Sequence, residues 1–197
     1  MPKPLILIVL SGQMGSGKST IAQHFREQGF THIRLGEFFK SQARDQQMEF
    51  VPYMEQLERT VGEEGKARIL MEHVSKLASK SSGVIIESAY SKPFIDSLRK
   101  SFVGSNIFVV TTTSQKKIRV QRVTARNNVS RKEAFRLVSF WDAKRRQLGI
   151  DDVRKLSDLI VSNSRIQKNT VGRVVESQVR ARLHDRLFSV LRRTGKR

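Results

Sequence analysis

Short runs of consecutive apolar residues alternate along this chain with longer stretches in which apolar residues recur every three or four positions. The run Leu5–Leu10 (LILIVL) is apolar throughout, which is typical of a parallel strand buried on both faces. Gly83–Glu87 (GVIIE), Asn106–Thr111 (NIFVVT) and Leu159–Ser162 (LIVS) repeat this signal, and Phe30–Leu35 is a further candidate. The pattern therefore predicts about five strands.

Helical spacing fills the intervals between these strands. The first predicted helix begins within a glycine-rich segment, near Gly17, and runs to about Gln28, where Gly29 would cap its end. Further helices are predicted at 37–47, 54–80, Pro93–Phe102, 114–126, 130–148 and 166–193. Interruptions are expected near Val51-Pro52 and Gly62–Gly65. Strands that alternate with helices of this length form right-handed βαβ units, so we expect helices on both faces of a parallel sheet. The predicted fold is a single, doubly wound α/β domain over residues 1–197, in which a long basic helix is followed by a basic tail at 192–197.

Composition narrows the class of protein. An apolar share of 38% is too high for a disordered chain, and the absence of cysteine excludes disulfides and thiolate metal sites. No apolar run approaches the roughly 18–20 residues needed to cross a bilayer. Because Leu5–Leu10 leads straight into glycines without a small-residue cleavage site, we interpret it as a buried strand rather than a signal peptide. We expect a cytoplasmic protein without membrane contact.

The net charge of +19 is distributed unevenly. Residues 1–98 carry 12 Lys/Arg and 11 Asp/Glu, whereas residues 99–197 carry 25 and 7, so their balances are +1 and +18. This asymmetry indicates an anionic partner beyond a single nucleotide, with nucleic acid as one candidate for residues 99–197. The alternative is a solvated, arginine-rich helical face.

The segment from Gly12 to Ser19 (GQMGSGKS) matches the phosphate-binding pattern G-x-x-x-x-G-K-[ST] at every position. Its glycines let the backbone approach phosphate oxygens, while successive N–H groups and the positive end of the next helix attract an anion. We expect Lys18 to contact the β- and γ-phosphates of ATP, Ser19 to be a ligand of Mg²⁺, and Thr20 to reach the α-phosphate. The predicted nucleotide-binding residues in this segment are Gly12, Met14, Gly15, Ser16, Gly17, Lys18, Ser19 and Thr20.

The loop alone does not specify a reaction, because kinases, GTPases, motors and helicases all use it. The N-K-x-D motif of GTPases is absent, and the chain is short for a helicase core. The small-molecule kinases are the main class that remains.

Three segments together resemble the dephospho-coenzyme A kinases and related archaeal-type kinase-like proteins, within the nucleoside-monophosphate-kinase-like P-loop group. They are the loop, the stretch Arg119–Arg126 (RVQRVTAR) and the stretch Ser157–Asn163 (SDLIVSN). The resemblance extends over about residues 5–180. It implies that residues at about 115–150 form a helical lid and the helices after it. It also implies that Asn163 lies near the adenine.

The arginines of that stretch suit a lid on physical grounds as well. Arg119, Arg122 and Arg126 are three and four residues apart and share one helical face. A guanidinium group holds phosphate oxygens in a bidentate way and stabilises the charge of a transferring phosphoryl group. We assign Arg122 and Arg126 to the lid, with a solvated basic face as the alternative.

The chain departs from the family at its acidic positions. Glu87 stands at a strand end where these kinases commonly have Asp, and could hold Mg²⁺ through a water or act as a base. In place of an acidic D-x-D signature the chain has Arg34–Phe39 (RLGEFF), where only Glu37 could be the catalytic acid. Which of Glu37 and Glu87 is the catalytic carboxylate stays open.

Other features carry weaker signals. The four histidines lack any metal-ligand spacing and are interpreted as surface or core residues. Trp141 is predicted to anchor the core rather than stack on a base. The Lys144-Arg145-Arg146 cluster and the arginines of the last helix could follow a nucleic-acid backbone, but a solvated face is the simpler interpretation.

We therefore expect an ATP- and Mg²⁺-dependent phosphotransferase acting on a small phosphorylated, nucleotide-like acceptor. Dephospho-coenzyme A ranks first among acceptors, and nucleoside or deoxynucleoside monophosphates rank second. The competing hypothesis is an RNA- or ribonucleoprotein-associated NTP-binding protein that uses the basic half, and an inactive subunit is a third. The choice between ATP and GTP rests on the resemblance, and the oligomeric state stays open.

Overall fold

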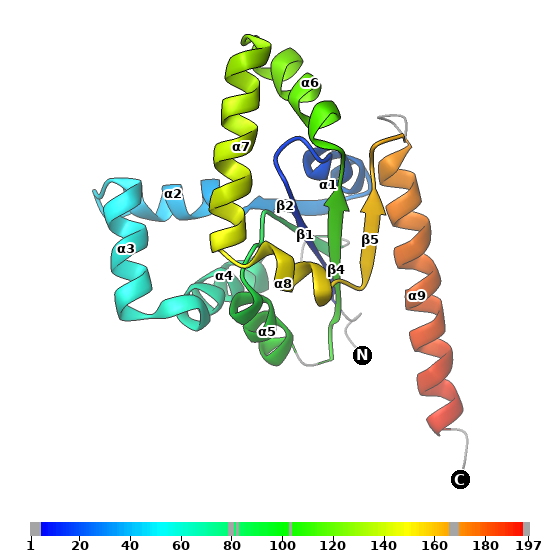
Figure 1. Ribbon diagram of the computed structural model, residues 1–197. Helices are drawn as coiled ribbons and strands as arrows, with labels where there is room; N and C mark the ends of the chain where they lie inside the picture. Colours follow the sequence, from blue (N-terminus) through cyan, green and yellow to red (C-terminus); the bar gives the residue numbers. More distant parts are fainter. Residues whose placement is uncertain (1–4, 79–80, 82, 103, 166–169, 195–197) are drawn as a thin grey trace.

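A parallel, five-stranded sheet forms the centre of the molecule in the computed structural model (Figure 1). The structure describes residues 5–78, 81, 83–102, 104–165 and 170–194, with side chains in the last helix described up to Leu183. The strands lie in the order β2-β3-β1-β4-β5. Their bounds are β1 Ile6–Gly12, β2 Phe30–Arg34, β3 Gly83–Glu87, β4 Asn106–Thr113 and β5 Leu159–Ser162.

Helices connect the strands and cover both faces of the sheet. Their bounds are α1 Lys18–Glu27, α2 Leu35–Asp45, α3 Phe50–Thr60, α4 Gly62–Ala78, α5 Lys92–Ser101, α6 Lys116–Asn127, α7 Arg131–Gln147, α8 Ile150–Lys155 and α9 Val171–Thr194. None of the described helices is long and apolar enough to cross a membrane.

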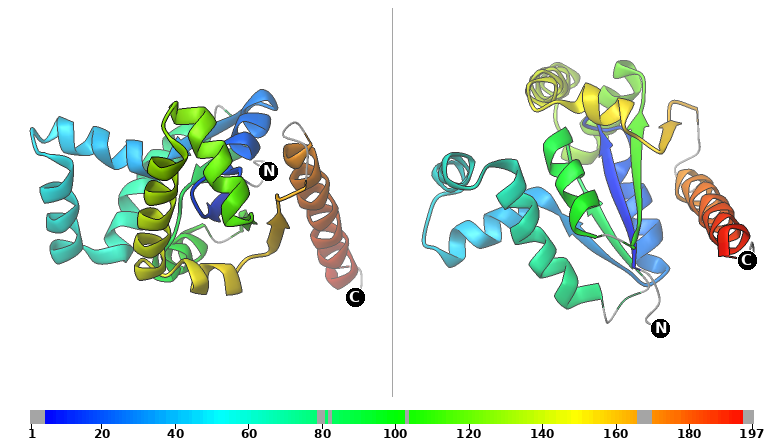
Figure 2. Two further views of the ribbon diagram at one scale, coloured as in Figure 1. Left: turned by 45° about the horizontal axis from the view of Figure 1, so that its top comes forward. Right: turned by 90° about the horizontal axis from the view of Figure 1, so that it is seen from below.

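The side chains of β1 show why the sheet needs cover on both faces. Leu7 and Val9 pack into a core with α2–α5 and α8, whereas Ile8 and Leu10 pack into a second core with α1 and α9. All four are fully buried, and complete burial of each contributes about 1.5–3 kcal/mol. Figure 2 shows the sheet between these two helical layers. The predicted doubly wound α/β class is confirmed.

The helix α9 closes the face of the sheet that carries α1. Gly172 lies against the His24 ring, where an added Cβ would stand 2.4 Å from the Cβ of His24. One turn further on, His24 Nε2 and Glu176 Oε2 are 2.7 Å apart. Val175 fills the core beneath α1. The first and last helices therefore depend on each other.

The helices α6 and α7 form a hairpin over the carboxyl edge of the sheet, with a small core of their own (Figure 1). That core consists of Val120 and Val123 from α6, and Ala134 and Val138 from α7, with Met14 of the glycine loop packed against it. The hairpin is thereby fixed over the phosphate loop.

All five predicted strands are confirmed. The interruption predicted near Val51-Pro52 lies a few residues earlier, between the end of α2 at Asp45 and the start of α3 at Phe50. Val51 and Pro52 lie in the first turn of α3, where proline lacks only an N–H that has no helical partner. The short helix α8 was not predicted. The helix α9 continues through Thr194, so residues 192–194 of the expected tail are helical, and residues 166–169 and 195–197 lie outside the described part.

Candidate nucleotide-binding and catalytic site

Three glycines of the loop between β1 and α1 have backbone dihedral angles that would be strained for any other residue. Gly12, Gly15 and Gly17 have φ angles of 136°, 76° and 107°. An added Cβ would stand 2.4 Å from the carbonyl oxygen of Thr112 at Gly12 and 2.1 Å from Nδ2 of Asn163 at Gly17. The sequence therefore uses glycine here both for its dihedral angles and for close packing against the neighbouring segments.

Lys18 is folded back over this loop. Its Nζ donates hydrogen bonds to the carbonyl oxygens of Gly12, at 2.7 Å, and Gln13, at 3.0 Å. The pKa of Lys18 is lowered from 10.5 to about 7, first by burial and then by the nearby positive charge of Arg145. A buried ammonium group with this pKa is stabilised by an added anion.

The start of α1 meets the end of β3 through a carboxylate. Ser19 Oγ donates a 2.6 Å hydrogen bond to Oε1 of Glu87, and His32 Nε2 lies 2.9 Å from Oε2. Although burial raises the pKa of Glu87, the hydrogen bonds from His32 and Ser19, together with the charge of Lys18, lower it to about 2. Glu87 is therefore a carboxylate at neutral pH. It is oriented by His32, which had been interpreted only as a surface or core residue.

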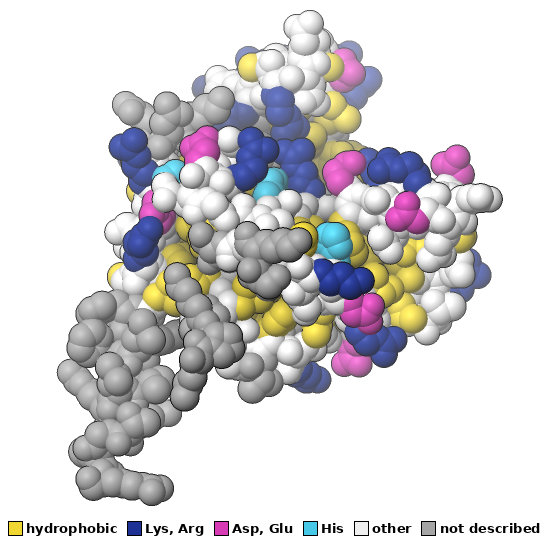
Figure 3. All heavy atoms as spheres, turned by 180° about the vertical axis from the view of Figure 1, so that it is seen from behind, with side chains coloured by type: hydrophobic (Ala, Val, Ile, Leu, Met, Phe, Trp, Pro, Cys, Tyr) yellow, Lys and Arg dark blue, Asp and Glu magenta, His cyan; other side chains and the backbone are white. Residues whose placement is uncertain are grey.

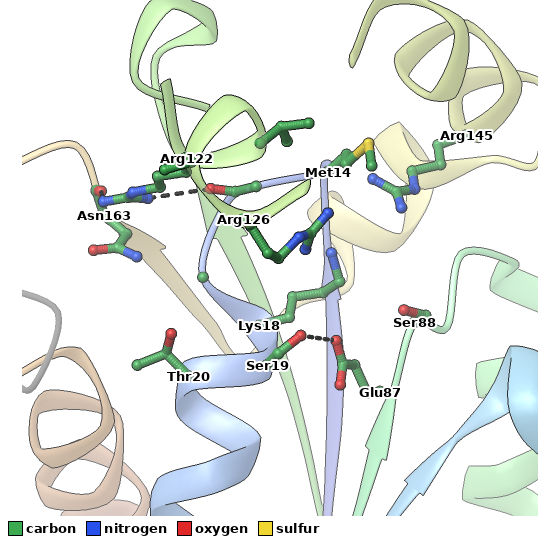
Figure 4. Close-up of a pocket in the computed structure, with 14 residues that line it drawn as sticks. Met14, Lys18, Ser19, Thr20, Glu87, Ser88, Arg122, Arg126, Arg145 and Asn163 are labelled. Carbon is green, nitrogen blue, oxygen red and sulfur yellow. Dashed lines mark hydrogen bonds between the residues drawn. The ribbon is translucent and has the colours of Figure 1, made fainter. Parts of the chain in front are cut away.

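These groups surround one cavity of about 720 Å³ (Figure 4). The size suits a small-molecule ligand, for which sites of about 300–1,000 Å³ are usual. Four cationic side chains and one carboxylate line it, so the cavity favours a polyanion. The lining residues are Met14, Gly15, Gly17, Lys18, Ser19, Thr20, Glu87, Ser88, Arg122, Val123, Ala125, Arg126, Arg145 and Asn163.

The three arginines of α6, of which Arg122 and Arg126 are the predicted lid residues, take different positions. Arg122 donates to the carbonyl oxygens of Gly15, at 3.2 Å, and of Asn163, at 2.8 Å, and therefore joins α6 to the loop after β5. Arg126 is exposed and points toward Lys18 from above (Figure 4). Arg119 is absent from the cavity lining and pairs with Asp142 inside the hairpin.

The Arg119 side chain is a structural element of the hairpin. Two of its nitrogens donate to the two carboxylate oxygens of Asp142 on α7, each at 2.8 Å, and both side chains are buried. The guanidinium group also donates to the carbonyl oxygens of Ser114, at 3.0 Å, and Met14, at 3.3 Å. This pair holds α6, α7 and the phosphate loop in one arrangement.

Asn163 packs directly on the phosphate loop. Its Nδ2 donates to the carbonyl oxygen of Ser16 at 2.9 Å, and its backbone N–H donates to Thr113 at 2.7 Å. The buried Oδ1 atom has no hydrogen-bond partner within the described residues. That acceptor suits an N–H donor of a ligand at the end of the cavity beside α6.

A family model described as an AAA domain matches residues 8–139, about two thirds of the chain. The chain belongs to this family. The match begins in β1 and includes the whole phosphate loop, the Glu87 strand and most of the α6–α7 hairpin, so the AAA domain contains nearly all the residues of the cavity.

Curated relatives and solved structures resemble this chain over most of its length. A UPF0200 protein of Thermococcus onnurineus is 23% identical over 87% of this chain and 95% of its own length. A UPF0200 protein of Pyrococcus furiosus is 28% identical over 80% and 88%. Among solved structures, shikimate kinase from Acinetobacter baumannii in complex with shikimate aligns with a TM-score of 0.53 and 16% identity over 92% of this chain and 95% of that one. The likeness shows a P-loop, kinase-like fold, and the resemblance to dephospho-coenzyme A kinases stays a prediction.

Arg145, which lies beyond the residues that the family model matches, is the cavity residue that sequence reasoning misplaced. It was grouped with Lys144 and Arg146 on a solvated face, yet it lines the cavity from α7 and its pKa is lowered by burial. Its guanidinium carbon lies 4.8 Å from the centre of the Tyr90 ring. Two of its buried nitrogens, Nε and Nη1, have no hydrogen-bond partner within the described residues. Helical spacing could have separated Arg145 from its neighbours, because it lies seven residues, about two turns, after the buried Val138 and three after the buried Asp142.

Glu37 is not brought to this cavity. It lies in the exposed first turn of α2, with Oε1 at 3.1 Å from Nζ of Lys40, and is absent from the lining. The local pattern that suggested a catalytic acid there did not fix which way α2 faces. Of the two candidate carboxylates, the geometry favours Glu87.

Within the described residues, no cluster of three or more His, Asp or Glu side chains could hold a metal ion.

Proposed function

We propose that this protein is a phosphotransferase that moves the γ-phosphoryl group of ATP to a hydroxyl or phosphate oxygen of a small, anionic, nucleotide-like acceptor. The observation that carries the proposal is the position of Glu87. Its carboxylate accepts the Ser19 hydrogen bond of the phosphate loop and also lines the cavity beside Ser88, on the side away from Asn163 (Figure 4). One cavity thus offers a donor cradle and a carboxylate facing a second ligand.

The donor would bind along the loop. Lys18 and the loop N–H groups would hold the β- and γ-phosphates, and the free Oδ1 of Asn163 would accept from the base. Ser19 Oγ and Glu87 Oε1 are adjacent oxygen atoms of the kind that Mg²⁺ prefers, so these two residues fit as its protein ligands, directly or through water. When bound, Mg²⁺ supplies charge neutralisation for the β- and γ-phosphates.

The transfer itself follows from the charges around the cavity. An acceptor oxygen attacks the γ-phosphorus, the bond to the bridging oxygen breaks, ADP leaves, and the acceptor proton passes to solvent. A carboxylate whose pKa is about 2 is a poor proton acceptor at neutral pH, so Glu87 acts by position and charge rather than as a base. Arg126 and Arg145 stabilise the negative charge of the transferring group from above.

Among acceptors, dephospho-coenzyme A remains the first candidate and nucleoside or deoxynucleoside monophosphates the second. Each candidate is anionic and nucleotide-like, which agrees with the unpaired nitrogens of Arg145. The structural likeness to shikimate kinase concerns the fold, so shikimate is included only as a comparison acceptor.

The test is ADP release from Mg²⁺-ATP with a panel of these acceptors. We expect one acceptor to stimulate release, and Lys18→Ala to lower kcat/KM by about 100- to 1,000-fold, because it removes a charge that acts on the transferring phosphates. Glu87→Gln should lower kcat strongly, whereas the matched control Glu37→Gln should change it less than about twofold, because Glu37 lies outside the cavity. Tight ATP binding without stimulation by any acceptor would contradict the proposal, and a larger effect of Glu37→Gln would reassign the carboxylate.

A further inference from the structure

A continuous series of rings and cations leads from the cavity to the surface of α7. The Arg145 guanidinium carbon lies 4.8 Å from the centre of the Tyr90 ring and 5.8 Å from the Trp141 ring. The rings of Trp141 and Phe140 meet edge to face with centres 5.4 Å apart. Arg145 lines the cavity, whereas Phe140 is 62% exposed.

The predicted role of Trp141 as a core anchor is wrong. It is 40% exposed, and Phe140 beside it is more exposed still, while the buried side of α7 is made by Ala134, Val138 and Asp142. The helix α7 already has a buried face, so these two neighbouring exposed rings do not contribute to packing of the core. Such a patch indicates an interaction surface.

The charges around these rings select the partner. Arg136 and Lys144 lie four residues before and after Phe140, so they flank its ring on the same helical face, and both are exposed. The two acidic residues of α7 do little to balance them, because Asp142 is buried in its pair with Arg119, which leaves Glu133. Among the described residues, neither Arg136 nor Lys144 is in a salt bridge, so the rings are bordered by cations that a ligand can reach.

The described part of α9, the other strongly basic helix, lacks this combination. The described side chains of α9 include Arg173, Arg180 and Arg182 but no aromatic ring, and Arg180 is paired with Glu176. On the opposite face of the molecule, Lys and Arg are interspersed with Asp and Glu (Figure 3). Charge alone does not distinguish α7, but charge next to exposed rings does.

We propose that the exposed face of α7 binds single-stranded nucleic acid, with bases stacked on Phe140 and Trp141 and phosphates against Arg136 and Lys144. Unpaired bases offer flat faces to aromatic rings and phosphates to flanking cations, which is how proteins bind single strands without reading their sequence. A duplex keeps its bases stacked inside and would leave both rings in water. This proposal does not depend on the phosphotransferase reaction.

Trp141 is the only tryptophan of the chain, so its fluorescence reports on this surface directly. The probes are twelve-nucleotide oligouridylate and oligothymidylate, titrated at several salt concentrations. Either or both should quench Trp141, with affinity falling as salt rises, and the ratio of their affinities shows whether the 2′-hydroxyl is read. Uridine monophosphate is the control for a ligand that binds only in the cavity.

Three variants and two controls assign the binding to α7. Phe140→Ala should weaken binding by about 5- to 100-fold, because one stacking ring is lost. Arg136→Gln and Lys144→Gln should each reduce the slope of log K against log salt by about 0.7, the contribution of one phosphate of a single strand. The controls are Val51→Ala, another exposed apolar residue at 62%, and Arg173→Gln, an exposed arginine of α9. Neither should change the affinity more than about twofold.

Four results would each overturn the proposal. The first is no quenching by either oligomer at low salt, and the second is equal quenching by uridine monophosphate. The third is loss of binding in Arg173→Gln with none in Phe140→Ala, which would move the site to α9. The fourth is a dimer, detected by light scattering, that Phe140→Ala dissociates, because a second copy would then occupy the rings.

Discussion

The two sides of the cavity are built differently: its floor is formed by the phosphate loop and the end of β3, and its roof is formed by the α6–α7 hairpin. On the floor, Lys18 is bonded to two carbonyl oxygens, and Ser19 is bonded to Glu87. On the roof, Arg126 is exposed, and Arg145 has two buried nitrogens without a partner in the described part of the chain. The floor is therefore complete before a ligand arrives, whereas the roof still has hydrogen bonds to offer. The part common to P-loop proteins is preformed, and selectivity for a second ligand falls to the hairpin.

Removing the ion pair that fixes the roof should produce the largest effect. Asp142→Ala leaves Arg119 as a buried, unpaired cation, and we expect the free energy of unfolding to fall by about 3–5 kcal/mol. The matched control is Asp152→Ala, which removes an exposed pair with Lys155 and should cost no more than about 1 kcal/mol. Urea denaturation of both variants measures the difference. Equal losses would mean that the hairpin is held by its apolar contacts alone.

Replacing Arg145 should separate function from stability. We expect Arg145→Met to lower acceptor-stimulated turnover by about 100-fold, because a charge aimed into the cavity is lost. Folding stability should stay within about 1 kcal/mol of the original or rise, because two buried donors without partners are removed. Arg146→Met, an exposed neighbour, should change neither quantity appreciably. A marked loss of stability in Arg145→Met would show that this residue belongs to the preformed part of the site.

The smallest effect concerns the protonation of Lys18. Its pKa of about 7 lies below the unfolded value of 10.5, so the unfolded chain binds more protons between these values, and Lys18 makes the ligand-free protein more stable as pH rises through that window. Bound phosphates should restore the charge of Lys18. Binding of ADP at pH 8 should therefore take up as much as one proton, and affinity should fall by up to tenfold per pH unit from pH 7 to 9.

Calorimetry in two buffers with different ionisation enthalpies measures this proton uptake. Lys40→Ala changes an exposed lysine outside the cavity lining and should leave the uptake unchanged. Binding without proton exchange at pH 8 would mean that Lys18 is already charged on the empty floor.

The sequence predicts the floor better than the roof. Continuous apolar runs identified the strands, and because parallel strands end at one edge of a sheet, Glu87 could be placed beside the phosphate loop. The roof depends on contacts that no local pattern contains. Arg119 shares a helical face with Arg122, but a carboxylate 23 residues later turns it into the hairpin. The exposure of Trp141 likewise depends on which face of α7 packs against α6.

The packing of α9 on α1 has a consequence for how the protein is made. The core beneath the phosphate-loop helix is completed by Val171, Val175 and Val179, which leave the ribosome more than 140 residues after Lys18. During synthesis the α1 face of the sheet therefore stays uncovered until α9 has emerged. A nascent chain should gain the ability to retain nucleotide late and abruptly, and until then it exposes an apolar surface that chaperones can recognise.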